Sequence, residues 1–413
     1  MTPAELSDAV LRCVRDAVAA RELDVPVPRD PRQAAVRAVR RVGGSPEGAE
    51  DAHYASSIAL RLAGPAGLPA AEVAALVSRR LAAVPGIERA EVAGPGFVNV
   101  VLDEGAPVEL VRRIRAAGPA FGRVDLHPGA GPGGSAGPGG SSGSPAGAAG
   151  AAAAFVPAPH LRARVTAEVL ERLTAAAGVP VAAPEAVDPL AVRPPQWLTG
   201  SGAPSAGRPA ESVSAASPVL PAPAAREPGR PEPDIREADP READLLEAAL
   251  LARLGSDDLR WALLRPAAGD LPRLPERPVQ RERNPRFRVQ YARSRAHALS
   301  REAGRLGFDA EPGEVLADGP EAVAATGALC AALAAHPTEL ELAARRRAPD
   351  RFVRHLEVAA DVFTRWNDLC PPLPKGEEKP SAAHRARLAL AEAAGTVLAG
   401  GLDLLGVTAP AHL

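Results

Sequence analysis

A single histidine precedes a helical pattern in the middle of the chain. His160 lies in the stretch FVPAPHLRAR, which leads into VTAEVLERLTAAAGVPV. A histidine placed in this way can stabilise charge on a phosphate, as nucleotide-binding signatures require. It can equally be an ordinary surface residue at the start of a helix. Which of the two it is decides whether the chain carries the nucleotide site of an enzyme.

Other groups that could do metal or redox chemistry are poorly placed for it. The three cysteines, Cys13, Cys330 and Cys370, are far apart and form no CxxC pair, so neither a zinc site nor a disulfide framework is expected. The glycine-rich run GAGPGGSAGPGG lacks the strand, the helix and the lysine of a phosphate-binding loop. Six more histidines have no acidic partner at ligand spacing and are expected at the surface: His53, His127, His297, His336, His355 and His384. We therefore expect no metal site.

The composition limits the possible partners. With 413 residues, the chain has room for two or three domains. Its net charge is only −2, so any surface for nucleic acid must be a local basic patch. No apolar run reaches the roughly 18 residues of a membrane helix, and the charged, amphipathic stretch MTPAELSDAVLRCVRD is unlike a signal peptide. We expect a cytoplasmic protein with no membrane and no DNA partner.

Residues 1–126 are expected to form a compact α/β domain. Apolar residues at helical spacing predict a first helix near residue 10, and two more helices are predicted at 54–64 and 69–84. The stretch IERAEVAGPGFVNVVL predicts two short strands on either side of a Gly-Pro-Gly turn. After residue 126 the composition changes to mostly Gly, Ala, Pro and Ser, which marks the end of this domain.

Two segments of low complexity divide the middle of the chain. Residues 127–154 are almost entirely Gly, Ala, Pro and Ser, and such a segment cannot bury enough apolar surface to offset the entropy of ordering it. Residues 183–242 are rich in Pro, Ala, Ser, Arg and Glu. Both are expected to be flexible, disordered linkers. Between them, 155–182 predicts a strand, a turn and a helix.

Residues 243–413 predict an all-helical bundle. Apolar stripes at helical spacing run through NPRFRVQYARSRAHALSREAGRLG, RFVRHLEVAADVFTRWNDL and HRARLALAEAAGTVLAGGLDLLGV. Trp366 lies on the second of these stripes, so it is expected in the core. The fold class expected for the whole chain is α+β, with an N-terminal α/β domain, disordered linkers and a C-terminal helical bundle.

Both ends of the chain resemble one known family. The stretch NPRFRVQYARSRA and the ending GLDLLGVTAP are similar to the DALR-type anticodon-binding domain of arginyl-tRNA synthetases. The N-terminal stretches HYASSIALRLA and VAGPGFVNVVL resemble the additional N-terminal domain of the same enzymes, which contacts the elbow of the tRNA. The resemblance implies that the chain binds tRNA, and tRNA for arginine in particular.

The middle of the chain departs from that family. There the family has a nucleotide-binding catalytic domain that opens with a His-x-Gly-His signature. The stretch PAPHLRARVTAEVLERLTAAAGVPV resembles this opening with His160 at the second histidine, but Pro157 replaces the first histidine and Pro159 replaces the glycine. The stretch DLLEAALLARLGSDDLRWALL resembles the segment just after the family's lysine-bearing second signature. Residues 155–182 are thus expected to be a remnant of the catalytic domain, and His160 a vestige.

Adenylation is not expected from this remnant. The resemblance implies that two histidines and a lysine stabilise charge on the α-phosphate, while a glycine lets the nucleotide approach the backbone. A proline has no N–H to offer, and its ring blocks that approach. Only Lys375 and Lys379 are lysines among the 48 basic residues, so the second signature is absent. The remnant is also short for several βαβ units of about 30 residues each. No catalytic residue and no ATP cofactor are expected.

Arginine clusters are the expected RNA-binding surface, because guanidinium groups bind phosphate oxygens and stack on bases of single-stranded loops. The residues expected to contact RNA in the bundle are Arg283, Arg286, Arg288, Tyr291, Arg293, Arg295, Arg346, Arg347 and Arg351. Tyr54 and Asn99, in the family-like N-terminal stretches, are two further candidates, whereas Phe97 is expected to pack in the core. A solvated basic helix face with no RNA contact is the alternative for the arginines.

Three functions remain open from the sequence. The first is a non-catalytic, arginyl-tRNA-synthetase-like protein that binds tRNA. The second is an arginine–tRNA ligase, or an accessory subunit of aminoacylation or ligation, whose ATP site is supplied by a partner enzyme. The third is a protein-interaction scaffold that recruits partners through its Pro-rich linkers.

Overall fold

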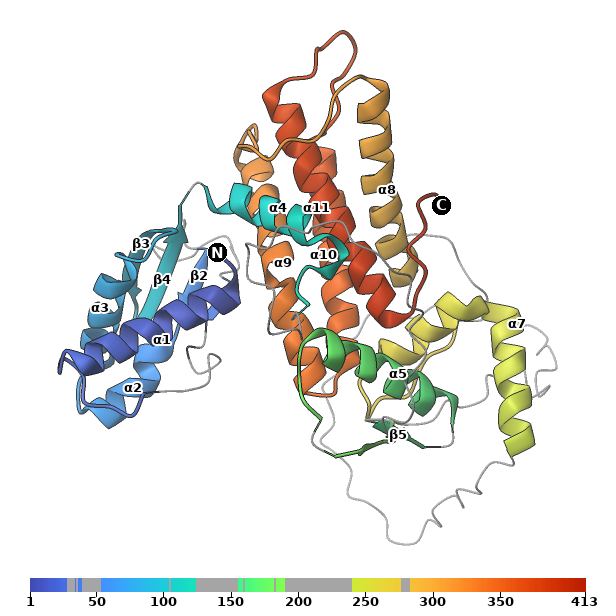
Figure 1. Cartoon of the computed structure of the whole chain (residues 1–413), viewed down its shortest axis with the longest axis horizontal. Coiled ribbons are helices and arrows are strands. Elements are labelled where there is room, and N and C mark those ends of the chain that lie inside the picture. The colour runs from blue at the N-terminus through green and yellow to red at the C-terminus, as the bar shows by residue number, and fades with distance from the viewer. Residues whose placement is uncertain are drawn as a thin grey trace, which may run out of the picture.

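The computed structural model describes residues 1–27, 34, 36–38, 53–103, 105–123, 155–158, 160–181, 183–189, 240–275 and 283–413. Small sheets and helices make up the N-terminal part, and the C-terminal part is all helical (Figure 1). The expected α+β fold class is confirmed. Outside the described residues lie the linker expected at 127–154 and most of the linker expected at 183–242. The same holds for His127 and Pro159.

Within the described residues up to 103, three helices and a four-stranded antiparallel sheet form the N-terminal part. The elements are α1 (Pro3–Ala19), β1 (Val36–Ala38), β2 (Tyr54–Ser56), α2 (Ile58–Ala66), α3 (Ala70–Leu81), β3 (Ile87–Ala93) and β4 (Phe97–Leu102), with strand order β1-β2-β4-β3. A capping box starts α1, in which the Thr2 hydroxyl accepts from the Glu5 N–H and the Glu5 carboxylate accepts from the Thr2 N–H. At the β3–β4 turn, a Cβ on Gly96 would lie 2.7 Å from the Cβ of Ala70, so only glycine fits there.

Two expectations about the N-terminal part are wrong. Residues Tyr54–Ser56 are not the start of a helix but strand β2, in which Tyr54 pairs with Val100 of β4. Alternate residues of this short strand face the core, and that pattern of period two is too brief to recognise in the sequence. Phe97 does not pack in the core but is 38% exposed, because it is the first residue of β4, beside the turn.

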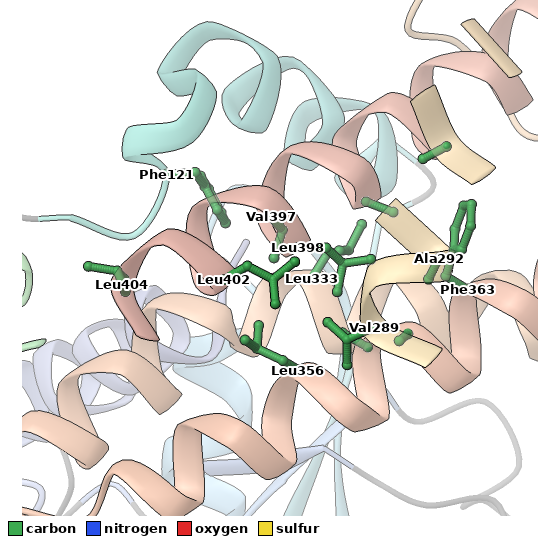
Figure 2. Close-up of a cluster of buried hydrophobic side chains, with 14 of the residues drawn as sticks. Phe121, Val289, Ala292, Leu333, Leu356, Phe363, Val397, Leu398, Leu402 and Leu404 are labelled. Carbon is green, nitrogen blue, oxygen red and sulfur yellow. The ribbon is translucent and has the colours of Figure 1, made fainter. Parts of the chain in front are cut away.

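Helix α4 (Ala106–Ala117) leaves the sheet and crosses the bundle beside α11 (Figure 1). A short 3₁₀ turn (Gly118–Ala120) follows, and a Cβ on Gly400 of α11 would lie 2.9 Å from the carbonyl oxygen of Pro119. The next side chain, Phe121, points toward Val397 in the bundle core (Figure 2). Ion pairs from Arg115 to Glu392 and from Arg123 to Asp403 border this contact. The N-terminal part is thus docked on the bundle through α4.

Five helices build the described residues of the C-terminal part. They are α7 (Pro240–Leu264), which kinks at Gly255, α8 (Pro285–Arg305), α9 (Pro320–Arg345), α10 (Pro349–Leu369) and α11 (Ala382–Leu405). Trp366 is fully buried, as expected, and its indole N–H donates to the Thr326 hydroxyl at 3.2 Å. Among the described residues, only α11 is long and apolar enough to cross a membrane. Most of its apolar window, 78%, is buried inside the protein, so packing in the bundle core accounts for its composition.

The middle segment forms a small parallel sheet and one helix at the end of the bundle. Strands β5 (Phe155–Pro157) and β6 (Glu185–Val187) pair in parallel, and α5 (Leu161–Ala176) lies between them in the chain. Its buried Val165, Val169 and Leu173 belong to the same core as the bundle helices. The expected strand and helix are present, and they pack as part of the bundle.

Arg162 fastens α5 to the end of α7. The residue is only 1% exposed, and its guanidinium donates to five backbone carbonyls, those of Leu263 (3.0 Å), Pro266 (3.0 Å), Ala267 (2.8 Å), Ala268 (3.5 Å) and Asp270 (2.8 Å). The Leu263 carbonyl lies in the last turn of α7, where carbonyls lack partners within the helix and carry partial negative charge, and the other four belong to the loop that follows. Burial lowers the pKa of the guanidinium, and the carbonyl shell compensates by solvating its charge.

Two histidines lie buried where α4 docks, although the sequence led us to expect both at the surface. Nδ1 of His336 on α9 lies 3.2 Å from Nε2 of His355 on α10, and the ring of Phe121 stacks on His336 with centroids 6.3 Å apart. Burial lowers the pKa of both imidazoles, well below the ordinary value for His336 and to about 4 for His355. Helical stripes rich in alanine hid this packing from the sequence, and α9 itself was not anticipated.

We predict that Arg162→Met strongly destabilises the protein. The variant leaves several buried carbonyls without a donor, each costing about 1–3 kcal/mol. The free energy of unfolding should fall by roughly 3–5 kcal/mol, as when one partner of a buried charge network is removed. Urea denaturation measures this. The control is Arg164→Met, which breaks only a half-exposed ion pair to Glu247 and should cost less than about 1 kcal/mol. Equal losses in the two variants would refute the role given to Arg162.

We also predict acid sensitivity from the buried histidine pair. An unfolded histidine has an ordinary pKa of 6.5, so the unfolded state binds protons first as the pH falls. Stability should be fully present above about pH 6.5 and decline toward pH 4, by about 1.4 kcal/mol per unit of pKa difference. Urea midpoints at several pH values measure this decline. His355→Gln should flatten it, whereas His412→Gln, at an exposed position, should not; parallel curves for all three proteins would count against the prediction.

Candidate nucleic-acid interface

Helix α8 carries the first arginine cluster, and its start is fixed by local chemistry. The side chain of Asn284 caps the helix by accepting from the N–H of Arg286 at 3.1 Å. Arg286 itself is 8% exposed and forms two hydrogen bonds to the Asp258 carboxylate, at 2.7 and 3.0 Å. A buried, bidentate ion pair of this kind fixes α8 against α7. Arg286 therefore has a structural place and offers no surface to RNA.

The outer face of α8 presents a stripe of cations and one aromatic ring. Arg288, Tyr291 and Arg295 are spaced three and four residues apart and share one face of the helix. Tyr291 is 46% exposed and stacks on Phe287 with centroids 6.1 Å apart, which presents an aromatic platform to solvent. Arg283, just before the helix, and Arg295 are exposed.

Two other arginines of this cluster are partly engaged within the protein. Arg288 pairs with Asp361 of α10, with Nε 2.9 Å from the carboxylate oxygen. Arg293 is half-buried, and desolvation lowers the pKa of its guanidinium. The part of the cluster that can meet a ligand is thus Arg283, Tyr291 and Arg295, with Arg288 at its edge. We call these four residues the α8 stripe.

The second arginine cluster lies on the turn between α9 and α10. Arg347 adopts a left-handed backbone with φ of 52° and ends α9 in place of the usual glycine. Its guanidinium binds both carboxylate oxygens of Glu185 on β6, at 2.6 and 2.5 Å, and lies 5.0 Å from the centre of the Phe155 ring. Arg346 is exposed, and Arg351 lies 3.4 Å from Glu339. Arg347 therefore joins the small sheet to the bundle as well as contributing charge.

The two clusters are separate along the bundle. Asp361, which meets Arg288, and Pro349, at the second cluster, are both on α10. At 1.5 Å per residue, the helix separates these positions by roughly 18 Å. An RNA strand that touches both clusters must therefore span several nucleotides.

The N-terminal candidates are not on the surface. Tyr54 is 3% exposed and Asn99 is 8% exposed, and both lie in paired strands of the sheet. Burial raises the pKa of the Tyr54 phenol further, because the charged form would lose its water. Neither side chain has a face to offer to RNA, and neither belongs to the interface that we propose below.

His160 is the N-cap of α5. Its Nδ1 accepts from the N–H of Ala163 at 3.2 Å, and its Nε2 lies 3.2 Å from the carboxylate of Asp188. Both ring nitrogens are therefore used inside the protein, one to start the helix and one to hold the end of β6. The sequence could not reveal Asp188 as a partner, since it lies 28 residues away. No group of three metal-ligating side chains occurs in the described parts of the chain.

Two family models match the chain, one in its N-terminal part and one in its C-terminal part. The family model of the DALR anticodon binding domain matches residues 289–413, and that of the arginyl tRNA synthetase N-terminal domain matches residues 14–102. Neither match extends into the segment that holds α4, α5 and α7.

Curated relatives and solved structures are similar to the chain over part of their length. The arginine–tRNA ligases of Renibacterium salmoninarum and Paenarthrobacter aurescens are 42% and 39% identical over 167 residues, which are 40% of this chain and 30% of each relative. The chain thus spans about a third of the length of these curated relatives. The arginyl-tRNA synthetase structure from Thermus thermophilus is 23% identical and covers 44% of this chain and 29% of that chain, with a TM-score of 0.30. Through its N-terminal domain and its DALR anticodon-binding domain, the chain belongs to the arginyl-tRNA synthetase family.

Proposed function

We propose that this protein binds tRNA, that for arginine in particular, and does not itself aminoacylate it. The α8 stripe carries the proposal for binding. It combines exposed guanidinium groups with an exposed tyrosine ring on a helix of the anticodon-binding domain. Such a surface can hold phosphates and stack a base of the single-stranded anticodon loop. The cytoplasm, where tRNA is charged, is its proposed place of action.

The proposed division of the chain follows the contacts. Residues 1–126 form the N-terminal unit, and 155–182 and 243–413 form one bundle, with linkers at 127–154 and 183–242. Helix α4 fixes the N-terminal unit to α11, and Glu5 of α1 holds Arg113 of α4 at 2.7 Å. Two tRNA-contacting modules held in this way bind with the advantage of a high effective concentration.

The middle segment supports the absence of catalysis. The single histidine left from the signature, His160, already caps a helix and binds Asp188. Pro157 lies in strand β5, where the signature's first histidine would stand, and no lysine precedes Lys375. Donors for an α-phosphate are therefore missing where adenylation would need them.

We expect the chain to shift tRNA for arginine in a gel, with an affinity that falls steeply as salt is added. Arg283→Glu combined with Arg295→Glu should weaken binding by about 10- to 100-fold and lower the slope of log affinity against log salt by roughly 1–2 units. Tyr291→Ala should weaken binding with little change in that slope, because stacking is not ionic.

The matched control is Arg305→Glu combined with Arg345→Glu. These two arginines are also exposed on the bundle, but each is already paired with a glutamate of its own helix. The control changes the net charge by the same amount and should bind nearly as well as the wild type. Equal weakening by both pairs would show that net charge, and not the α8 stripe, governs binding.

A second experiment tests catalysis. With arginine, ATP and tRNA present, the purified chain should give no exchange between ATP and pyrophosphate above background. Exchange that disappears in His160→Ala would show a working site in the chain and would overturn this part of the proposal. Exchange that appears only after a partner enzyme is added would favour an accessory subunit, and a chain that binds no tRNA at low salt would favour an interaction scaffold.

A further inference from the structure

A cavity of about 420 Å³ opens where α5, the end of α7 and the α9–α10 turn meet. Five arginines line it: Arg162, Arg346, Arg347, Arg351 and Arg354. Among the described lining residues, Asp350 is the only acid. The volume of the cavity falls in the range of about 300–1,000 Å³ that is usual for small-molecule sites.

The charges of these arginines are incompletely neutralised. Arg162 is almost fully buried and is surrounded by backbone carbonyls, which are dipoles and carry no formal charge. Arg346 is exposed and forms no ion pair with any described residue. For Arg351, the carboxylate of Glu339 lies 3.4 Å from one terminal nitrogen, and its Nε lacks a hydrogen-bond partner within the described chain.

Acidic groups around the cavity are fewer than the cations and are already engaged. Asp350 pairs with Arg354 at 2.8 Å, Glu185 pairs with Arg347, and Asp270 acts on Arg162 from the α7 side. The N-terminal end of α10, at Pro349, also faces the cavity and adds its partial positive charge. The C-terminal end of α7 carries the opposite partial charge, and Arg162 binds one carbonyl of its last turn, that of Leu263.

We infer that this cavity is a binding site for a phosphate group. Planar guanidinium forks match the geometry of phosphate oxygens, and the exposed Arg346 lines the cavity without an ion pair to any residue that the structure describes. Arg347 is held by Glu185 and Phe155 in a strained backbone conformation, which fixes the wall of the site before a ligand arrives. The phosphate belongs either to the backbone of a bound tRNA or to a free phosphate compound, and only the first case rests on the proposed function.

Calorimetry with inorganic pyrophosphate tests the free compound. The full chain should bind pyrophosphate at an ionic strength held constant with sodium chloride, and Arg346→Gln should weaken this binding by about tenfold, the loss of one charge-assisted contact. Arg345→Gln is the control, because this neighbouring arginine is exposed and paired with Glu341 but does not line the cavity. Since both positions are exposed, both variants should unfold at the wild-type temperature.

Gel shifts with tRNA for arginine test the RNA backbone. Arg346→Gln combined with Arg351→Gln should weaken tRNA binding by about tenfold or more if the phosphate is that of the RNA, whereas Arg345→Gln should not. Either positive result supports the site and identifies its ligand. If pyrophosphate does not bind and the tRNA affinity of the double variant equals that of Arg345→Gln, the inference is wrong, even where the α8 stripe still binds tRNA. Pyrophosphate binding without any tRNA binding would leave the site intact and overturn the proposed function instead.

Discussion

One buried guanidinium holds the middle of the chain in place. Strands β5 and β6 and helix α5 have a small core of their own, formed by Phe155, Ala167, Leu170 and Val187. A core of that size cannot offset the entropy of ordering a separate domain. Arg162 lets the segment share a larger core instead, because its five carbonyl contacts join α5 to the end of α7. The carbonyls of the last turn of α7 and of the loop after it gain a donor, and the cation gains a shell of carbonyl oxygens in place of water. The segment is in this way part of the helical bundle.

The same bundle also receives the N-terminal part. Phe121 and the turn before it fit against Gly400 and Val397 of α11. The neutral histidines His336 and His355 pack on the Phe121 side of this contact. Close packing of a backbone against a glycine leaves little freedom for α4 to move. The sheet is therefore held at a fixed place beside the bundle, in spite of the low-complexity segments elsewhere in the chain. The contact between the two parts thus depends on α4 and its turn and not on the low-complexity segments.

Much of the secondary structure could be predicted from the sequence, whereas contacts that depend on distant residues could not. The stripes of Val289, Phe363 and Leu398 predict α8, α10 and α11 because each helix buries a single face. The sequence pattern did not predict helix α9, because the helix is rich in alanine and contains Pro337, so its apolar residues form no narrow stripe. Of the expected RNA-binding residues, Tyr54 and Asn99 are buried, because a short strand does not show which face is covered. Arginine identity likewise cannot tell Arg286, paired with Asp258 in the interior, from Arg295 on the surface.

The arginines of this chain have three different tasks that composition does not separate. Arg162 and Arg286 are buried and hold helices together, Arg286 through the Asp258 carboxylate and Arg162 through backbone carbonyls. Arg305 and Arg345 are exposed but paired with glutamates on their own helices, which neutralises most of their field in water. Arg283, Arg295 and Arg346 are exposed at the two clusters, and it is residues of this third kind that raise the local potential of a chain whose net charge is −2. Affinity for a polyanion depends on the number of phosphates that such groups neutralise and not on the count of basic residues. A chain that is close to neutral as a whole can therefore still carry local basic surfaces of the kind that bind a polyanion.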